Sequence, residues 1–191
     1  LPGMRSRQSG FSLREMLFVV GIMGVLSTIA IAQIAQAVPA MKADGAMRVV
    51  MGQLNTAREL AISQRRYIQV KFIAPNQMQV IRTDVNAAGA VTGTTLLSTV
   101  TFESGITYNI VAGLPDTPDA FGIATPVSFG AAATIQFATD GELVDQTGSP
   151  LNGTIVVASP LIKNSSRAVT VFGATGRVRG YRWNAKAWVL V

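Results

Sequence analysis

The sequence predicts an α+β protein, with one long N-terminal helix followed by an antiparallel β-rich domain. Two observations predict this class. No Asp, Glu, Lys or Arg occurs between Met16 and Met41, and after Arg66 the spacing of apolar residues changes from a helical period to alternation. One long helix followed by many short strands is an α+β layout, in which the helix covers one face of the sheet. We therefore expect a leader over residues 1–10, a helix over 11–66 and a globular domain over 67–191.

Residues 1–10 carry Arg5 and Arg7 and lack apolar periodicity, which is typical of a leader peptide. The uncharged stretch has 26 residues, and at about 1.5 Å per residue it is roughly 39 Å long as a helix. This length exceeds the bilayer core of about 30 Å. Because Arg5, Arg7 and Arg14 precede the stretch, we expect a single transmembrane pass with a cytoplasmic N-terminus and a periplasmic C-terminal domain.

The helix should continue beyond residue 41 with a different character. Met47, Val50 and Leu54 recur at three- and four-residue steps, while charged side chains occupy the other faces. This amphipathic half should pack one side against the globular domain. Pro39 removes a helix hydrogen bond and predicts a kink near residues 35–39, with Gly45 as a second weak point.

Alternating apolar residues predict short strands from residue 67 onward. Tyr67–Ile73 and Gln77–Thr83 flank a turn at Pro75-Asn76 and should form a hairpin. Residues 112–133 should form a long loop. Further strands are expected at Thr94–Glu103, Ile106–Val111, Thr134–Thr139, Thr154–Ser159, Arg167–Phe172 and Arg177–Trp183.

The residue inventory argues against an enzyme. The chain has no His, the usual general base and zinc ligand, and no Cys, so that neither a disulfide framework nor a thiolate metal site is possible. Its 10 acidic residues fall in no metal-binding spacing and lie beside no phosphate-binding glycine loop. We therefore expect no catalytic residues, no metal site and no cofactor.

Charge is strongly segregated along the chain. Residues 1–82 hold ten Lys/Arg and three Asp/Glu, a net charge of +7. Residues 83–162 hold seven acidic residues and no basic ones, and residues 163–191 hold six basic residues and no acidic ones. Such segregation is consistent with a polyanion partner, and equally with head-to-tail stacking of identical subunits.

The junction between the basic leader and the apolar stretch carries a specific motif. Residues 9–15 read SGFSLRE, and the apolar run MLFVV follows at once. This arrangement resembles the type III signal of type IV prepilins and pseudopilins. The resemblance implies that a prepilin peptidase cuts between Gly10 and Phe11, that the new amine of Phe11 is methylated, and that the apolar stretch stays attached.

Glu15 is the expected assembly residue. A carboxylate at the edge of an apolar helix costs several kcal/mol if it is left unpaired in a low-dielectric bundle, so it should find a cation. The resemblance implies that this cation is the Phe11 amine of an adjacent subunit and that the pair sets the register between subunits. Arg14 stands where such signals usually have an aliphatic residue, and it offers two alternatives: a local pair with Glu15, or a contact with a lipid phosphate.

An ordinary secretory signal peptide is the alternative interpretation of the N-terminus. Small residues at 30–32 and 35–37, in the form AIA and AQA, are candidate cleavage sites. The length of the apolar stretch, the acidic residue at its start and the continuation of the helix past residue 40 favour the pilin-like interpretation. A mature chain that starts at Gln33 or Val38 would identify the secretory alternative.

Both ends of the chain extend the resemblance to the GspH/FimT branch of pseudopilins and minor pilins. Residues 54–66 read LNTARELAISQRR and resemble the helix-to-sheet junction of that branch, and residues 169–179 resemble its closing hairpin. The resemblance implies a structural subunit, minor in kind, of a type IV pilus or a type II secretion pseudopilus, held in the bacterial inner membrane until assembly. Its implied partners are other pilins, the prepilin peptidase, the inner-membrane assembly platform and, before assembly, membrane lipid.

The basic C-terminal strand suggests a second function. Residues 176–179 read GRVR and resemble the GRxR element with which FimT-like minor pilins are thought to hold DNA. Charged residues on an edge strand also prevent unwanted strand pairing, which is the structural alternative. A third alternative, a plainly anchored ligand-binding domain, has no positive feature in the sequence. On a regular strand, one face would carry the side chains suited to phosphate contact and base stacking, which are Arg177, Arg179, Tyr181 and Trp183. Arg182 would lie beside them.

Overall fold

The computed structural model describes residues 11–86, 90–130 and 134–191, without the side chains of residues 29–33, 35 and 36. The leader expected over residues 1–10, including the processing residue Gly10, lies outside the described residues. The chain divides into two compact units at the boundary between Val38 and Pro39. Each unit is described by itself below.

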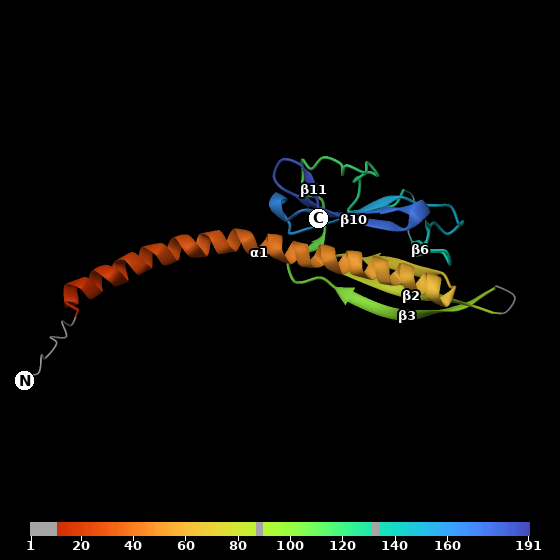
Figure 1. Ribbon diagram of the computed structural model, residues 1–191, viewed down its shortest axis with the longest axis horizontal. Helices are drawn as coiled ribbons and strands as arrows, with labels where there is room; N and C mark the ends of the chain where they lie inside the picture. The colour runs from red at the N-terminus through yellow and green to blue at the C-terminus, as the bar shows by residue number, and fades with distance from the viewer. Residues whose placement is uncertain (1–10, 87–89, 131–133) are drawn as a thin grey trace, which may run out of the picture. The chain divides into compact units, whose positions relative to one another are not determined.

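The helix α1 extends over Leu13–Gln64, which is 52 residues, and is assigned without interruption through Pro39 and Gly45 (Figure 1). Its bounds agree with the expected range within two residues at either end. The helix stops where Arg65 adopts a φ of 50°, in the left-handed region that ends many helices. The kink near residues 35–39 stays a prediction.

Short strands follow the helix in the second unit, and two single 3₁₀ turns separate some of them, at Lys163–Ser165 and Gly173–Thr175. The strands are β1 (Ile68–Ile73), β2 (Gln77–Val85), β3 (Val91–Thr101), β4 (Thr107–Tyr108), β5 (Val127–Ser128), β6 (Ile135–Phe137), β7 (Leu143–Val144), β8 (Gly153–Ala158), β9 (Arg167–Phe172), β10 (Arg177–Trp183) and β11 (Trp188–Leu190).

These strands form two antiparallel sheets, so that the expected α+β class with a long helix and an antiparallel β-rich domain is confirmed. One sheet has the order β3-β2-β1-β6-β7 and the other the order β11-β10-β9-β8-β4, with β5 paired to β8. The expected hairpin of β1 and β2 is formed, and Val70 pairs with Val80 in it. The segment 112–133, expected as a loop, contains β5, and β7 and β11 were not expected.

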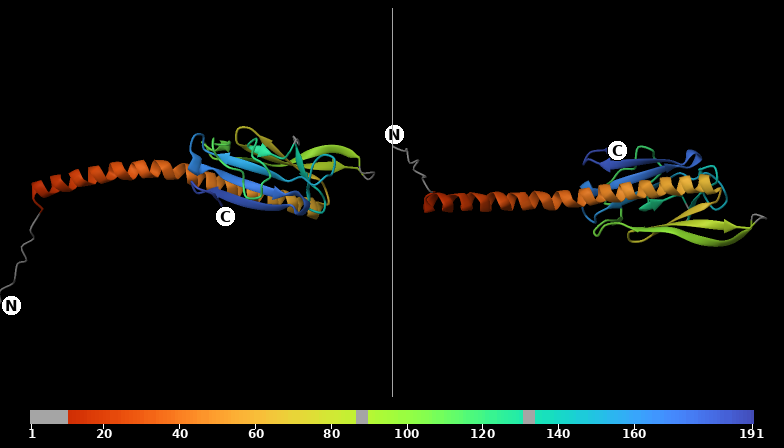
Figure 2. Two further views of the ribbon diagram at one scale, coloured as in Figure 1. Left: turned by 90° about the horizontal axis from the view of Figure 1, so that it is seen from above. Right: turned by 60° about the horizontal axis from the view of Figure 1, so that its bottom comes forward.

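The amphipathic half of α1 packs against both sheets and not against one alone (Figure 2). Met47, Val50 and Leu54 on the helix are at most 1% exposed. They share a single buried cluster with Val80 of the first sheet and Val169 of the second. The expectation of one covered sheet face was therefore too simple, because the apolar stripe of the helix is wide enough to serve two sheets.

A second, smaller cluster lies on the other face of the six-stranded sheet. Tyr181, Trp183 and Trp188 are buried there, and partly buried apolar side chains at positions 110, 114 and 123 pack against them. We call residues 109–126 the overlying segment. The six-stranded sheet is therefore covered on both faces, by the helix and by the overlying segment (Figure 1).

Candidate functional site

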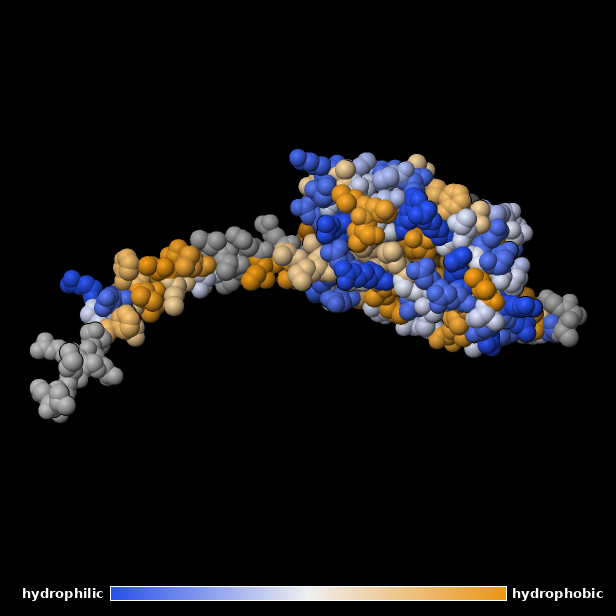
Figure 3. Space-filling model, in the orientation of Figure 1, coloured by the Kyte–Doolittle hydropathy of each residue, from blue (hydrophilic) through white to orange (hydrophobic). Residues whose placement is uncertain are grey.

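The first candidate site is the apolar part of α1 in the first unit. Leu17, Phe18 and Leu26 are exposed by 60 to 71%, and their apolar neighbours between residues 13 and 26 are exposed as well (Figure 3). Ser27 and Thr28 donate their hydroxyls back to the helix, to the carbonyls of residues 23 and 25 at 2.7 Å each. Such back-bonding removes the need for water at these hydroxyls. This part of the helix thus presents an apolar surface that no other described residue of its unit covers.

A groove lies in this apolar surface. It has a volume of about 440 Å³ and is lined by apolar side chains around Gly21. No atom lies within 4 Å of the point where a Cβ would stand on Gly21 or on Gly24. Small residues of this kind let the backbone of a second helix approach closely. The groove therefore leaves room at Gly21 for the close approach of another backbone.

The helix begins with a capping box formed by Ser12 and Glu15. The Ser12 backbone N–H donates to Glu15 Oε2 at 3.1 Å, and the Glu15 backbone N–H donates to Ser12 Oγ at 3.2 Å. These two bonds satisfy donors that a helix N-terminus otherwise leaves free. Sequence reasoning missed this role, although the S-x-x-E spacing before an apolar run is its signal. Among the described residues Glu15 has no ion-pair partner, and the local pair with Arg14 is not formed.

Phe11 directly precedes this cap and is 80% exposed. The capping box uses Oε2 of Glu15, and neither of the two hydrogen bonds of this box involves Oε1. An amine placed beside Glu15 could therefore be bound without breaking the cap.

Within the described residues, no helix is both long and apolar enough to cross a bilayer.

The second candidate site is β10, where the structure differs from the expected binding face. Tyr181 and Trp183 are 4% and 6% exposed, because the overlying segment covers them. They offer no open ring surface for base stacking. Arg177 and Arg182 are exposed, and Arg179 is half-buried. The structure therefore does not present these side chains together as one open face of arginines and aromatic rings.

Asp119 of the overlying segment engages this strand. Its carboxylate accepts from Arg179 Nη1 at 2.6 Å, from the Tyr181 hydroxyl at 2.9 Å and from the Thr170 hydroxyl at 2.6 Å. The Asp119 side chain is only 13% exposed. Three donors from two adjacent strands thus hold one carboxylate, and the charge of Arg179 is neutralised within the chain. Sequence reasoning missed Asp119, because no local pattern links it to a strand 60 residues away.

Burial and hydrogen bonding oppose each other at this carboxylate. Burial works to raise the pKa of Asp119, but the hydrogen bonds from Thr170 and Tyr181 and the charge of Arg179 together hold the pKa below its ordinary value. Burial, and then the hydrogen bond to Asp119, raise the pKa of Tyr181. Asp119 is therefore ionised and Tyr181 protonated at neutral pH, which is the arrangement that the three hydrogen bonds require.

Two further contacts hold the overlying segment. Lys163 Nζ donates to the Gly113 carbonyl at 2.6 Å and lies 5.3 Å from the ring centroid of Trp183. Trp188 Nε1 donates to the Pro115 carbonyl at 2.9 Å. The segment is thereby fixed at three separate places along the six-stranded sheet.

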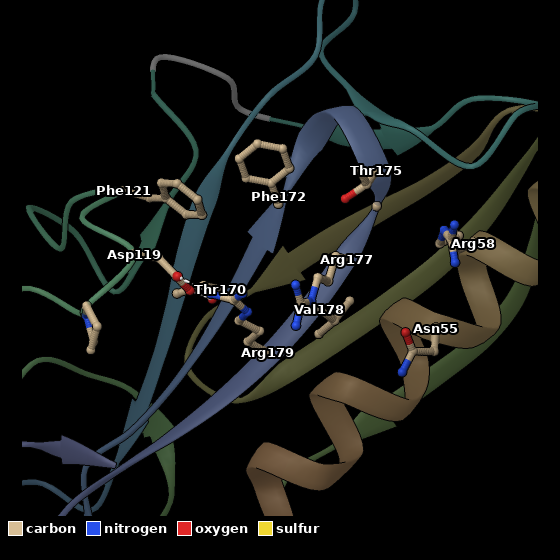
Figure 4. Close-up of a pocket in the computed structure, with 12 residues that line it drawn as sticks. Asn55, Arg58, Asp119, Phe121, Thr170, Phe172, Thr175, Arg177, Val178 and Arg179 are labelled. Carbon is tan, nitrogen blue, oxygen red and sulfur yellow. Dashed lines mark hydrogen bonds and ion pairs between the residues drawn. The ribbon is translucent and has the colours of Figure 1, made fainter. Parts of the chain in front are cut away.

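A pocket of about 830 Å³ lies beside the start of β10 (Figure 4). Arg58 of α1 and Arg177 of β10 both line it, with Asn55 and Phe172 among the other lining residues. Arg58 donates through Nε to the Gly141 carbonyl at 3.1 Å, and no hydrogen bond of its terminal nitrogens is formed within the described residues. The pocket therefore collects guanidinium groups from two elements that are far apart in sequence.

Gly176 explains why the pocket is built on this turn. Its φ is 61°, and a Cβ there would clash with the Gly141 carbonyl oxygen and would lie 2.7 Å from Arg58 Nε. A side chain would displace both neighbours, and the left-handed conformation would be strained as well. The glycine of the GRVR stretch is thus a requirement of packing at this corner.

Among the described residues, no group of three or more His, Cys, Asp or Glu side chains could hold a metal ion.

The structure brings Arg177 together with Arg58, which sequence reasoning did not single out. It separates Arg177 from Arg182, which lies at the other end of β10. Arg182 contributes neither to the pocket nor to the Asp119 cluster.

Comparison with known proteins gave matches only among solved structures. No protein-family profile matches the chain. No curated protein matches it either. The chain is similar to two crystal structures of the type IV minor pilin FimU from Pseudomonas aeruginosa, with 18% and 17% sequence identity and a TM-score of 0.48 in both cases. Each match covers 76% of this chain, and the two cover 91% and 96% of the FimU chains.

Proposed function

We propose that this chain is a structural subunit of a helical filament, of the type IV pilus or type II secretion pseudopilus kind, and that it assembles through the apolar part of α1. The observation that carries the proposal is the apolar surface between residues 13 and 26, which is exposed on all sides of the helix. A helix that is apolar all round is stable only inside a bundle or a membrane. The groove at Gly21 supports a bundle.

The magnitude of the hydrophobic effect favours assembly strongly. Moving one Leu, Val, Ile, Phe or Met side chain from water into apolar surroundings contributes about 1.5–3 kcal/mol. Ten such side chains between residues 13 and 26 are exposed by 40% or more, for example Leu17 and Phe18. Covering them with neighbouring helices would outweigh the entropy lost on association.

Processing and location belong to the same proposal. A prepilin peptidase would cut between Gly10 and Phe11, and the apolar stretch would hold the subunit in the inner membrane until an assembly platform adds it to the filament. The SGFSLRE motif supports this sequence of events, as does the capping box, which begins the helix two residues after the cleavage point. Sister subunits of the GspH/FimT branch would be its neighbours.

The test is isolation of filaments from cells that express the chain together with a pilus or pseudopilus assembly system. Filaments sheared from the cells should contain the subunit, and its N-terminal residue by mass spectrometry should be Phe11, with a methylated amine. Glu15→Ala should lower the amount of subunit in the filament fraction at least tenfold, with Glu15→Gln as the isosteric control for the lost charge. A mature subunit that starts at Gln33 or Val38 and is freely soluble would overturn the proposal.

DNA binding is the second candidate function, and a specific observation favours it. Arg58 and Arg177 line one pocket, and the described residues place no carboxylate against either guanidinium. Two such groups suit a phosphate backbone without base readout. We expect Arg177→Gln to weaken DNA binding and to reduce its salt dependence, and Arg179→Gln to have a smaller effect because Asp119 already neutralises Arg179. Binding unchanged by Arg177→Gln in a gel-shift titration would exclude this function.

A further inference from the structure

The pocket beside β10 carries positive charge that suits a carboxylate from another protein. The side chain of Arg177 forms no hydrogen bond or ion pair within the described part of the chain, and the Arg58 guanidinium uses only Nε. The one acidic residue that lines the pocket, Asp119, is bound by Arg179, Tyr181 and Thr170. Guanidinium groups that have no acidic partner in their own chain can form charge-assisted, bidentate hydrogen bonds with a carboxylate.

The chain itself carries a matching carboxylate. Within residues 83–162, where every charged residue is acidic, five carboxylates accept hydrogen bonds from their own surroundings: Asp84, Asp116, Asp119, Asp140 and Asp145. Glu142 adjoins Gly141, which contacts Arg58, so it lies at the same end of the domain as the pocket. Glu103 is exposed, and its side chain forms no bond within the described residues.

Glu103 and the pocket lie at opposite ends of the domain. Lys42 Nζ donates to the carbonyl of Ser104 at 3.1 Å, which places the Glu103 turn beside helix residue 42. The pocket lies beside helix residue 58. These helix positions are about 24 Å apart at ~1.5 Å per residue. Glu103 therefore cannot enter the pocket of its own chain, but it can enter that of a copy displaced along the helix direction.

We propose that Glu103 of one subunit binds in the Arg58 and Arg177 pocket of a second copy of this chain. The two surfaces differ, so the contact is head to tail, and such a contact continues into an open helical assembly when it does not close into a ring. The subunits keep their helices parallel, as co-insertion in one membrane requires. The proposal rests on the proposed filament function and specifies one of its subunit contacts.

Thiol-specific cross-linking in assembled filaments tests the contact, and the absence of native cysteine makes the experiment clean. Cells should express two singly substituted chains, Glu103→Cys and Arg177→Cys, first separately and then together. A short bismaleimide, which spans the distance that the Glu and Arg side chains would bridge, should give a covalent dimer in the mixture at a yield at least fivefold above either single variant. The doubly substituted chain should give a ladder of higher oligomers, because each subunit then bonds to two neighbours.

Charge exchange provides a second measurement that does not depend on the introduced thiols. Arg177→Glu and Glu103→Arg should each lower the yield of sheared filaments severalfold, and the two changes together should restore it to within twofold of the natural chain. Arg182→Glu is the matched control, an exposed arginine on the same strand that lies outside the pocket, and it should leave the yield unchanged.

The outcomes separate the two proposals. Filaments that form normally but give no 103–177 dimer, with no rescue by charge exchange, overturn the Glu103 contact and leave the filament function intact. Failure of the natural chain to enter filaments overturns both. If Arg177→Glu abolishes DNA binding while filament yield is unaffected, the pocket serves nucleic acid and the contact is wrong.

Discussion

At the scale of single residues, two side chains show how the domain is held together, and the first is Arg167. It is 2% exposed, and its Nε donates to Asp44 Oδ1 at 2.5 Å. Its terminal nitrogens donate to the carbonyls of Ala40, Asn164 and Ser166. A buried charge persists only when its donors are satisfied in this way. Arg167 thereby joins β9 to the first helical turns of the second unit.

Removing this buried arginine should be costly. Arg167→Ala leaves Asp44 and the three carbonyls without their donor, so we expect a loss of about 3–5 kcal/mol in the free energy of unfolding. Urea titration of residues 39–191, followed by circular dichroism, measures it. Arg167→Met keeps most of the side-chain volume, and it should lose clearly less than Arg167→Ala if the packing of the stem contributes. Equal losses in the two variants would assign the whole effect to charge and hydrogen bonding.

Asp119 is the second of these side chains, and it predicts acid sensitivity. Its pKa in the folded protein lies below the ordinary value of about 3.9. The stability that it contributes is therefore present above about pH 4 and is lost as the pH falls through the lower, folded value. Asp119→Asn should cost about 1–3 kcal/mol at pH 7 and should flatten the dependence of stability on pH below 4.

Thermal unfolding of the natural domain and of Asp119→Asn between pH 2.5 and pH 7 checks this prediction. Asp140→Asn is the control, because Asp140 is an exposed carboxylate that, among the described residues, accepts a hydrogen bond only from the backbone of Glu142, two positions along the chain. A natural domain that keeps its full stability at pH 2.5 would contradict the role assigned to Asp119.

At the scale of elements, glycines of the second unit separate into two kinds. Gly176 has a φ of 61° and lies against the Gly141 carbonyl, whereas Gly52 sits in the middle of α1, where an added methyl group would meet no atom within 4 Å. Gly176→Ala should destabilise the domain by about 1–2 kcal/mol through the left-handed conformation alone, and the contact with Gly141 adds to this. Gly52→Ala should stabilise it by about 0.5–1 kcal/mol, because a helix interior favours Ala.

Melting temperatures of the two variants, compared with that of the natural domain, measure these opposite signs. Gly148→Ala is a useful companion, since Gly148 has a φ of 86° but no neighbour within 4 Å, and it isolates the conformational cost from the steric one. A stabilising effect of Gly176→Ala would show that the corner of the pocket is not as closely packed as described.

The sequence predicted the elements whose periodicity extends over several residues. The helix, the β1–β2 hairpin, β9 and β10 were all expected, because apolar residues recur often enough there to define a period. Strands β5 and β7 have two residues each and β11 has three, which is too short for any period to emerge. The same limit applies to the overlying segment, whose position depends on contacts with residues 50 to 73 positions away.

At the scale of the whole molecule, the first unit and the second differ in what stabilises them. Every residue of the two buried clusters lies at position 43 or beyond. Residues 39–191 should therefore fold alone, as a soluble domain with a cooperative thermal transition. Circular dichroism and size-exclusion chromatography of that fragment test this, and a fragment that is molten or aggregated would show that the apolar stretch is needed for folding.

The candidate sites were predicted unevenly from the sequence, for a physical reason. The assembly region is local, since its motif and its apolar stretch are continuous in the chain, and its role in assembly stays a prediction. The C-terminal site is not local. Strand alternation correctly placed Arg179 and Tyr181 on one face, but it could not show that Asp119 and the overlying segment occupy that face.

Neither buried cluster contains a described residue before Ala43. This has an evolutionary consequence. Under the proposed function, selection on residues 13–38 would come from neighbouring subunits and lipid, whereas selection on later residues comes from the packing of the chain's own interior. Residues 13–38 should thus be replaceable by the equivalent helix of a related protein, and the melting temperature of the domain over residues 39–191 should stay nearly unchanged. What such a graft would alter is which partners the hybrid accepts.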